Sequence, residues 1–484
     1  MISCSADAIF ADDMNGKKVH IKSFGCQMNK LDTALVTTSL KRAGFEITAS
    51  VRDADAVVIN TCSVREHAEQ RVFSHLGHLK HLARSRPRPV VAVIGCMAQR
   101  LGAALLEHQA VDIVCGPAQI PKLTWMITEA IGQRKKTLAV SEHIRARDTD
   151  HQDQRLEHFE SSCAATDDRL AGQAFVRVMR GCDKFCTYCV VPSVRGPEVS
   201  RPPAAIVEQI KKLVDKGVKQ VTLLGQSVNS YRYVVGEKTY CLADLLEMAS
   251  QIDGLEWIKF VTNYPSRRFF DEILSAVADL DKVCEYLHIP AQSGSDKILR
   301  AMNRRYTAAE YLDLLARARG VVPGIAISGD FIVGFPGETD SDFRQTAELL
   351  EKAQYKNCFV FKYSPRPGTA AAAKLQDTVS SEIKRKRNIE LLARQEEISD
   401  RLAGRFLGKT VTVLVEGPSK KPHLDSAEGG DQPQLVGRTR TDHIVVFNGP
   451  ALLAGRFVKV KITKTAPLTL FGRLCRNIKE NAEP

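Results

Sequence analysis

Three cysteines lie close together in one short stretch of the chain: Cys182, Cys186 and Cys189, here called the loop trio. Their thiolates could bind zinc or an iron-sulfur cluster, but a structural zinc site takes four ligands, commonly as two separated pairs. No matching cysteine or histidine pair follows at that spacing. A [4Fe-4S] cluster bound by only three thiolates keeps one iron open, so the stretch predicts a cluster at which chemistry takes place.

A second set of cysteines is spread over the first hundred residues: Cys26, Cys62 and Cys96, here called the strand-end trio. Each follows a short run of β-branched residues that predicts a strand. In an open α/β sheet the ligand site lies outside the carboxyl ends of the strands, so these thiols can converge there and hold a second cluster. One cysteine after a strand is more often a buried apolar residue, but three are harder to explain that way. Cys115 also ends a predicted strand and is an alternative ligand.

The elements that position these cysteines follow from strand-like runs that alternate with amphipathic stretches, a pattern typical of an α/β protein. We expect residues 17–133 to form a domain with an open α/β sheet. Six further strand-helix units over 173–404 favour a partial (β/α)6 barrel, with the loop trio directly after its first strand. Residues 405–474 predict a small all-β barrel. The polar segment 134–172 predicts a linker, in which Cys163 has no assigned role.

The composition fits a cytoplasmic protein with more than one domain. A chain of 484 residues exceeds one ordinary core, so two or three domains are expected. Thirteen cysteines, an odd number, argue against a disulfide framework and for thiols that stay reduced. The first residues do not have the pattern of a signal peptide, and no apolar run is long enough to span a bilayer. We therefore expect no membrane partner.

The net charge of +12 predicts an anionic partner, and its distribution favours nucleic acid. Residues 405–484 carry 13 Lys and Arg against 7 Asp and Glu, which is half of the net charge in the last sixth of the chain. Small basic β-barrels commonly bind the phosphates of nucleic acids. A basic run is often only a solvated face, and Gly417–Gln434 predicts an exposed loop. The candidates for contact with RNA phosphates are Arg438, Arg440, Lys459 and Lys461.

Several stretches resemble motifs of the radical S-adenosylmethionine (SAM) methylthiotransferases, most closely of the MiaB type. Those that contain the strand-end trio are Gly25–Lys30, Asn60–Arg65 and Gly95–Gln99. The loop trio lies in the run RGCDKFCTYCVVPSVRG, Arg180–Gly196. Further similar motifs are Leu224–Tyr231, His288–Ser295 and Gly329–Thr339, and the closing β-barrel is similar to a TRAM domain. The resemblance extends from about residue 17 to residue 474.

The resemblance implies a reaction that replaces a carbon-bound hydrogen by a methylthio group. The loop trio would hold a [4Fe-4S] cluster that cleaves SAM to a 5′-deoxyadenosyl radical, and the strand-end trio would hold an auxiliary [4Fe-4S] cluster. Two SAM molecules are used per turnover, one for the methyl group and one for the radical. The implied substrate is N6-isopentenyladenosine at tRNA position 37, next to the anticodon, modified at carbon 2.

Other functions stay open. Related branches of the family modify N6-threonylcarbamoyladenosine in tRNA, or an aspartate in a ribosomal protein, and the Gln27–Asn29 run favours the isopentenyl branch. A different kind of function is also open: the chain could be a non-catalytic RNA-binding protein whose iron-sulfur clusters serve only the fold. The chain departs from the family's usual residues at Leu31–Thr33 and at Tyr264. Other members commonly have histidine at the position of Tyr264, so a substrate contact made by that histidine would be absent from this chain.

The resemblance also implies cofactor contacts and partners. The sequence shows no motif for a catalytic triad or for a pair of catalytic carboxylates, so we assign no catalytic residue beyond the cluster ligands. The implied partners are the anticodon stem-loop of tRNA, an electron donor such as flavodoxin or ferredoxin, and a sulfur donor, and we expect a monomer. The residues expected to contact SAM are Tyr188, Gly225, Gln226, Gln292 and Asp330.

Overall fold

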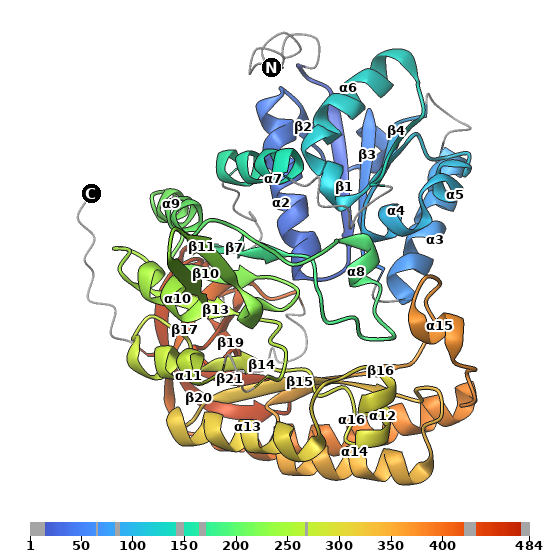
Figure 1. The fold of residues 1–484 in the computed structure, drawn as a ribbon. Helices are drawn as coiled ribbons and strands as arrows, with labels where there is room; N and C mark the ends of the chain where they lie inside the picture. Colours follow the sequence, from blue (N-terminus) through green and yellow to red (C-terminus); the bar gives the residue numbers. More distant parts are fainter. Residues whose placement is uncertain are drawn as a thin grey trace, which may run out of the picture.

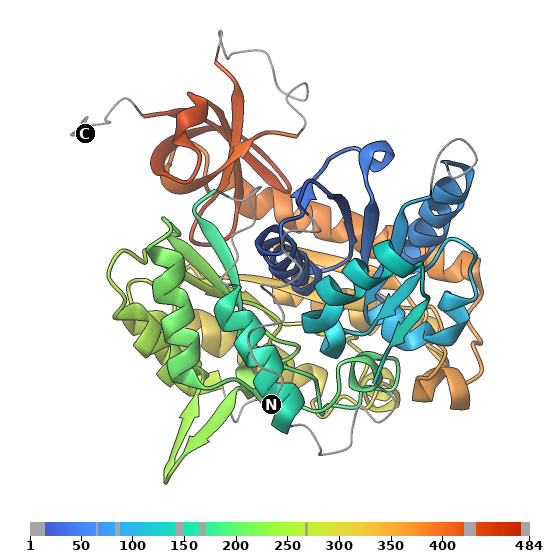
Figure 2. The same cartoon turned by 90° about the horizontal axis from the view of Figure 1, so that it is seen from above.

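The computed structural model describes residues 15–63, 66–82, 88–141, 150–163, 171–266, 270–420 and 432–475. Its three parts follow one another along the chain, with the N-terminal sheet above the strands of the central part in Figure 1. Seen from above, the C-terminal β-barrel stands at the margin of the molecule (Figure 2). Within the described residues, no helix is long and apolar enough to cross a membrane.

The N-terminal part contains a six-stranded parallel sheet in the order β2-β1-β3-β4-β5-β6. Strands β3 and β4 are buried along their whole length, because helices cover both faces of the sheet. This explains their continuous β-branched runs. The strands are β1 Lys18–Phe24, β2 Glu46–Ile47, β3 Ala56–Thr61, β4 Val90–Gly95, β5 Ile113–Cys115 and β6 Thr137–Ala139.

Two layers of helices cover this sheet. Helices α2, Gln27–Arg42, and α6, Leu123–Gln133, pack their apolar side chains on one face. Helices α3, Glu66–Leu82, α4, Cys96–Leu101, and α5, Ala103–Leu106, pack on the other. Short 3-10 helices lie at Val51–Asp53 and Pro117–Lys122. The predicted open α/β sheet is therefore confirmed.

The expected linker, residues 134–172, is in part a built element of the fold. Strand β6 adds to the edge of the sheet beside β5. Helix α7, Asp150–Ser162, is held to the central part by Arg201, whose Nε lies 2.6 Å from an oxygen of Glu157. Strand β6 thus extends the N-terminal sheet, and acidic residues of α7 form ion pairs with arginines of the central part. Residues 142–149 and 164–170 lie outside the described residues.

The central part contains two three-stranded parallel sheets, β7-β10-β13 and β14-β15-β16. A bridge between Ile258 and Val283 links them, so the six strands form the predicted partial barrel. Two short antiparallel strand pairs and a 3-10 helix interrupt the alternation of strands and helices. The pairs are β8 Met179–Arg180 with β9 Val199–Ser200, and β11 Arg232–Val235 with β12 Lys238–Cys241; the 3-10 helix is Val228–Ser230. The six strands are β7 Gln173–Arg177, β10 Gln220–Leu224, β13 Trp257–Phe260, β14 Tyr286–His288, β15 Ala326–Val333 and β16 Asn357–Lys362.

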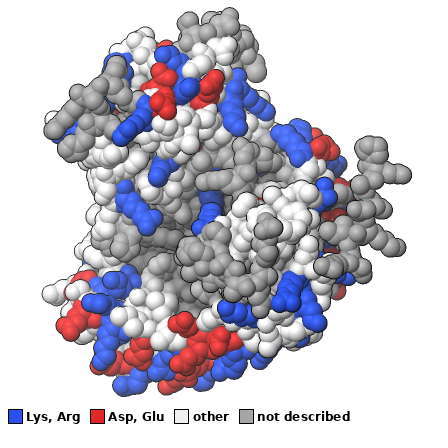
Figure 3. All heavy atoms as spheres, turned by 180° about the vertical axis from the view of Figure 1, so that it is seen from behind, with Lys and Arg blue, Asp and Glu red and all other residues white. Residues whose placement is uncertain are grey.

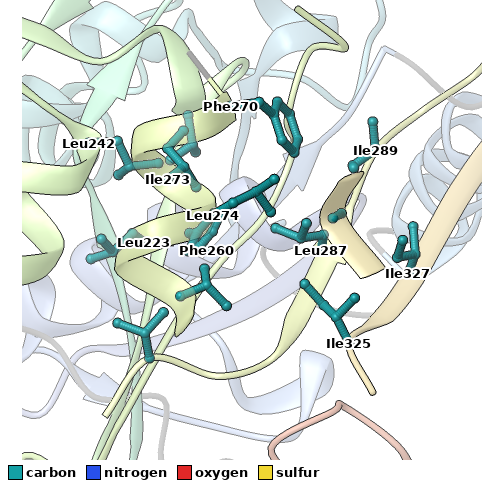
Figure 4. Close-up of a cluster of buried hydrophobic side chains, with 14 of the residues drawn as sticks. Leu223, Leu242, Phe260, Phe270, Ile273, Leu274, Leu287, Ile289, Ile325 and Ile327 are labelled. Carbon is teal, nitrogen blue, oxygen red and sulfur yellow. The ribbon is translucent and has the colours of Figure 1, made fainter. Parts of the chain in front are cut away.

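Helices pack against the outer face of this partial barrel and bury the largest apolar cluster. Figure 4 shows part of it, with Leu223, Phe260 and Leu287 of the strands facing Leu242, Phe270 and Leu274 of the helices. The helices of the central part are α8 Val191–Val194, α9 Pro203–Val214, α10 Leu242–Ser250, α11 Phe270–Asp279, α12 Asp296–Ala301, α13 Ala308–Val321, α14 Asp340–Ala353, α15 Ala370–Lys374 and α16 Ser381–Gly404.

The C-terminal part is a closed β-barrel in the order β17-β18-β19-β21-β20, which confirms the predicted all-β barrel. Its apolar residues alternate inward along each strand, as in β20, where Val458, Val460 and Ile462 are buried. Of the expected loop Gly417–Gln434, residues 421–431 lie outside the described residues. The strands are β17 Thr410–Pro418, β18 Gln434–Arg438, β19 Ile444–Asn448, β20 Phe457–Ala466 and β21 Thr469–Leu474, with a 3-10 helix at Ala451–Leu453.

Candidate active site

The strand-end trio lies at the carboxyl edge of the N-terminal sheet. Cys26 caps helix α2 directly after β1 and its loop, Cys62 follows β3, and Cys96 begins α4 directly after β4. These three strands are neighbours, and the strand order reverses direction between β1 and β3, where α/β sheets bind ligands. The Cys62 thiol donates a hydrogen bond to Cys26 and, against the effect of burial, lowers the pKa of Cys26 to about 6.

Two buried asparagines hold the loops of the strand-end trio together. Asn29 Nδ2 donates to Asn60 Oδ1 over 2.7 Å and to the Thr61 carbonyl over 3.0 Å. Asn60 Nδ2 donates back to the Asn29 carbonyl over 2.9 Å. Asn29 Oδ1 in turn accepts from the Cys26 amide over 3.3 Å and from its thiol over 3.2 Å. Both asparagines are fully buried, so they fix the segment of Cys26 against that of Cys62.

Two glycines permit this close approach. A Cβ atom on Gly25 would lie 2.6 Å from Cys62 Cβ and 2.5 Å from Asn29 Oδ1. At Gly95, where φ is +97°, a Cβ atom would lie 2.5 Å from the carbonyl oxygen of Thr61. Only glycine fits at these positions without moving the backbone that carries the cysteines.

Arg195 connects the strand-end trio to the central part of the chain. Its Nε donates to Cys96 Sγ over 3.2 Å, and its Nη2 lies 3.1 Å from Asp32 Oδ2 of helix α2. Asp32 also pairs with Arg177 of β7, and all three side chains are buried. Cys96 further packs against Val190 and Val194, which follow the loop trio in the sequence. The strand-end trio therefore contacts, through Cys96, the segment that directly follows the loop trio in the chain.

Neither of the remaining cysteines considered above joins the strand-end trio. Cys115 is fully buried in the apolar layer between the sheet and helices α2 and α6, and burial raises the pKa of its thiol far above the usual range. Cys163 is buried with Met28 and Leu31 where α2 meets the central part. Both positions are those of small apolar residues in a core.

The loop trio lies in the loop that follows β7 and β8, at the carboxyl end of the first barrel strand. The loop is closed by a hydrogen bond from the Cys182 amide to the Gly196 carbonyl over 3.1 Å. Gly181 packs directly against Pro197, so no side chain fits there. Within the loop the Cys189 amide donates to the Cys186 carbonyl over 3.0 Å. Distant segments also hold this loop, since the Thr187 amide donates to the Met302 carbonyl over 3.1 Å and Asn303 Nδ2 donates to the Phe185 carbonyl over 2.9 Å.

A buried arginine, Arg304, also lies against the loop trio. Its Nη1 donates to Cys186 Sγ over 3.4 Å, and its guanidinium stacks over the ring of Tyr264 with 4.6 Å to the ring centroid. Burial raises the pKa of Cys182 to about 11 and of Cys189 to about 12. A thiol in such surroundings becomes a thiolate only beside positive charge, and iron supplies that charge.

Both trios offer thiols alone, which are the ligands that iron-sulfur clusters take. Two donor sets of thiols alone, each with one arginine beside it, agree with a cluster that carries negative charge.

The residues expected to contact SAM lie in three places. Tyr188 packs against an apolar cluster with Met302, Phe335 and Tyr363. Gln226, at the end of β10, has a buried Oε1 without a hydrogen-bond partner, which fits a group reserved for a ligand. Gly225 beside it is needed for packing, since a Cβ atom there would lie 2.6 Å from Met179 Cγ.

Gln292 and Asp330 lie side by side in the second half of the barrel. Gln292 has a φ of +70°, and its backbone N–H donates to the Asp330 carbonyl over 2.7 Å. The Asp330 carboxylate lies 3.2 Å from His288 Nε2. Asp330 lies within β15, which continues to Val333. Its carboxylate is thus inside the barrel rather than at its rim.

The four residues expected to contact RNA separate into two pairs. Arg440 Nε lies 3.0 Å from Glu285, and Arg438 Nη1 lies 3.0 Å from Asp442. Arg440 thus pairs with the central part and Arg438 with Asp442 of the C-terminal barrel itself, and the two side chains are 32% and 33% exposed, so their contact with RNA stays a prediction. Lys459 and Lys461 are exposed on β20. On the face shown in Figure 3, Lys and Arg lie in the middle and acidic residues toward the margins.

Sequence reasoning did not find Arg195, Arg304, Asn29 or Asn60 as parts of the site. Asn29, Asn60 and Arg195 lie within the motifs quoted above, only a few residues from a cysteine, which was a usable signal. Arg304 is more than a hundred residues from Cys186 and gave no signal, since only the fold brings it there.

Comparison with known proteins gives three matches to family models. Residues 176–350 match the Radical SAM superfamily, residues 404–475 the TRAM domain, and residues 18–116 the Uncharacterized protein family UPF0004. Among solved structures, the chain resembles the radical SAM methyltransferase TsrM from Kitasatospora setae with a TM-score of 0.53 at 15% identity, over 74% of this chain and 77% of that one. This likeness concerns the fold alone.

Curated relatives match nearly the whole chain. The tRNA-2-methylthio-N6-dimethylallyladenosine synthase of Rhodopirellula baltica is 43% identical over 461 residues, which cover 95% of each chain. That of Syntrophotalea carbinolica is 40% identical over 448 residues, 92% of this chain and 97% of the other. The chain therefore belongs to the family of tRNA-2-methylthio-N6-dimethylallyladenosine synthases, within the radical SAM methylthiotransferases.

Proposed function

We propose that this protein methylthiolates carbon 2 of N6-dimethylallyladenosine, also called N6-isopentenyladenosine, at position 37 of tRNA. The observation that carries the proposal is the contact of the strand-end trio, through Cys96, with the segment that follows the loop trio, in a chain that matches the Rhodopirellula baltica enzyme over 95% of its length. The hydrogen on carbon 2 is not acidic enough for an ordinary base, which agrees with a site built from thiols rather than from paired carboxylates.

The loop trio and the strand-end trio would each hold a [4Fe-4S] cluster, with SAM bound beside them. When bound, these groups supply a 5′-deoxyadenosyl radical at the loop trio and the methylthio group at the strand-end trio, with two SAM molecules used per turnover. Arg304 and Arg195 each donate a hydrogen bond to one cysteine sulfur and hold that thiolate in place. Gln226 has an acceptor oxygen available for a SAM donor group.

The C-terminal β-barrel would hold the tRNA. Lys459 and Lys461 lie on alternate positions of β20, so both point outward from the barrel. Residues at this spacing can contact successive phosphates of the anticodon stem-loop. We expect the protein to act in the cytoplasm as a monomer, together with an electron donor such as flavodoxin or ferredoxin and a donor that restores the sulfur.

The test is mass spectrometry of tRNA nucleosides from cells that lack the protein. The expected result is loss of 2-methylthio-N6-dimethylallyladenosine and accumulation of the unmethylthiolated nucleoside. Expression of the wild type should restore the product and expression of Cys62→Ala should not. Unchanged amounts of product in the deleted strain would contradict the proposal, provided that no second enzyme of this family is encoded there.

A further inference from the structure

The strands β14, β15 and β16 have two different faces. The outer face packs against helices and carries Leu287, Ile327, Phe331 and Val333, all buried in the apolar core. Helices α13, α14 and α16 lie on this side of β15 and β16 in Figure 1. Side chains alternate along each strand, so the residues between these face the interior of the partial barrel. The interior residues include His288 of β14, Asp330 and Ile332 of β15, and Phe359 and Phe361 of β16.

Two phenylalanines on the interior face form an aromatic surface. Phe359 and Phe361 lie two positions apart on β16, with their ring centroids 6.3 Å apart and an angle of 18° between the ring planes. Phe359 is 49% exposed, which is unusual for a phenylalanine inside a barrel whose other face is fully packed. Exposed aromatic side chains are the groups on which nucleic-acid-binding proteins stack bases.

Polar groups that could read the edge of a base lie next to these rings. Asp330 is the register partner of Phe359 on the neighbouring strand, so the two side chains project from the same face. Oδ1 of the Asp330 carboxylate lies 3.2 Å from Nε2 of His288, within hydrogen-bond distance. A carboxylate beside an aromatic surface can accept the N–H that N6-dimethylallyladenosine keeps on its exocyclic nitrogen.

One end of β15 and β16 lies near the loop that carries the loop trio, here called the cluster loop, and the other end contacts the C-terminal barrel. Ile332, the register partner of Phe361, packs in the same apolar cluster as Tyr188 of the cluster loop. At the other end, Lys356 directly precedes β16, and its Nζ lies 3.3 Å from Asp442 of the C-terminal barrel. An RNA held by the C-terminal barrel can therefore place a base on this surface and have it face the cluster loop.

Enzymes that modify a base commonly rotate it out of its stack and place it between aromatic or apolar side chains. We propose that Phe359 and Phe361 form the stacking platform for the adenine ring that this enzyme modifies, with Asp330 at the edge of the ring. This inference rests on the proposed function, because it assigns the place of the target base within that reaction. The ring of SAM is the other adenine present, and the experiment separates the two.

The test is a thermodynamic cycle between one side chain and one base, measured with the intact holoenzyme. One RNA is an anticodon stem-loop with N6-dimethylallyladenosine at the target position, and the other is the same stem-loop with an abasic site there. Wild type is expected to bind the first RNA more tightly. In Phe359→Ala the advantage of the base should fall about tenfold, the scale of one base-aromatic stack, while SAM affinity stays unchanged.

Two further variants make the cycle specific. Phe359→Tyr keeps an aromatic ring and should retain the preference for the base, whereas Phe359→Leu keeps an apolar side chain and should lose it. Phe73→Ala is the matched control, because Phe73 is 46% exposed on helix α3 and is equally a surface phenylalanine. It should leave the preference for the base intact.

The outcomes distinguish this inference from the proposed function. If wild type shows no preference for the base and forms no methylthiolated product, the proposed function fails. If wild type prefers the base and Phe359→Ala keeps the full preference, the platform is refuted while the function stands. A loss of SAM affinity in Phe359→Ala with the preference for the base retained would assign the rings to SAM and refute the platform as well.

Discussion

The two cysteine trios reach similar arrangements by different means. The loop trio lies within eight residues, and its loop is closed by neighbours in the sequence, Gly181, Gly196 and Pro197. The strand-end trio is collected from three strands of one sheet over 71 residues, and fully buried Asn29 and Asn60 connect two of its three segments. The first is formed by one local loop, which the segment around Met302 then holds in place, whereas the second exists only when the whole sheet has folded.

This difference indicates how each site responds to damage. A substitution near the loop trio should affect one cluster and leave the fold intact. A substitution among the residues that hold the strand-end trio should affect both the cluster and the stability of the N-terminal part, because the same hydrogen bonds serve both. The four predictions that follow test this comparison.

The largest effect is expected from removal of a ligand. Cys62→Ala and Cys186→Ala should each lose half of the iron and all methylthiolation, because each removes one thiolate of one trio. The two should differ in SAM cleavage, which Cys62→Ala keeps and Cys186→Ala loses. Iron and sulfide analysis under anaerobic conditions, with chromatography of 5′-deoxyadenosine, measures both. Normal iron content in Cys62→Ala would move the auxiliary site elsewhere.

The second effect concerns the close packing of the strand-end trio. Gly95→Ala places a Cβ atom against the Thr61 carbonyl at a positive φ, and should cost about 3–5 kcal/mol of stability and the auxiliary iron. Gly102→Ala is the matched control, with φ +49° and no atom within 4 Å of the added Cβ. It should cost only about 1–2 kcal/mol. If denaturant titrations gave equal costs for the two variants, the loss of stability in Gly95→Ala would come from backbone strain and not from close packing against Thr61.

The third effect concerns the thiols of the iron-free protein. Cys26, with a pKa of about 6, should be largely thiolate at pH 7, whereas Cys182, with a pKa of about 11, should stay a thiol. Alkylation of Cys26 should therefore decrease as the pH falls through 6, and at pH 7 it should exceed that of Cys182 about a hundredfold. Peptide mass spectrometry after brief iodoacetamide treatment reports each site. Similar rates would mean that the two sets of thiols have similar surroundings.

The smallest effect is expected from the two arginines. Arg195→Met should cost about 1–3 kcal/mol, since Asp32 keeps its pairing with Arg177. It should shift the reduction potential of the auxiliary cluster and leave the other unchanged, because hydrogen bonds to the sulfurs tune that potential. Arg304→Met should shift the reduction potential of the cluster at the loop trio and leave that of the auxiliary cluster unchanged. Titrations followed by electron paramagnetic resonance separate the two clusters, and a shift of both potentials by either variant would contradict separate roles.

Much of the architecture could be predicted because it is local. The β-branched runs marked the strands of both α/β parts, and the alternation of apolar residues marked the C-terminal barrel. Helix α7 was missed because its polar side chains suggested a linker, and only the facing arginines make them interior. The carboxylate partners of Arg438 and Arg440 could not be predicted for the same reason, since a charge in the sequence does not show which opposite charge lies beside it.

The sequence by itself determined the type of chemistry. Three thiols within one short loop, and three more after consecutive strands, were sufficient to indicate two clusters with thiolate ligands. The tertiary structure alone decided which side chains surround them: Arg304 beside Cys186, Arg195 beside Cys96, and the half-exposed Phe359 inside the barrel. The reason is physical. Ligand identity is a property of residue types and their spacing, whereas burial, hydrogen-bond partners and exposure arise only when distant segments pack together.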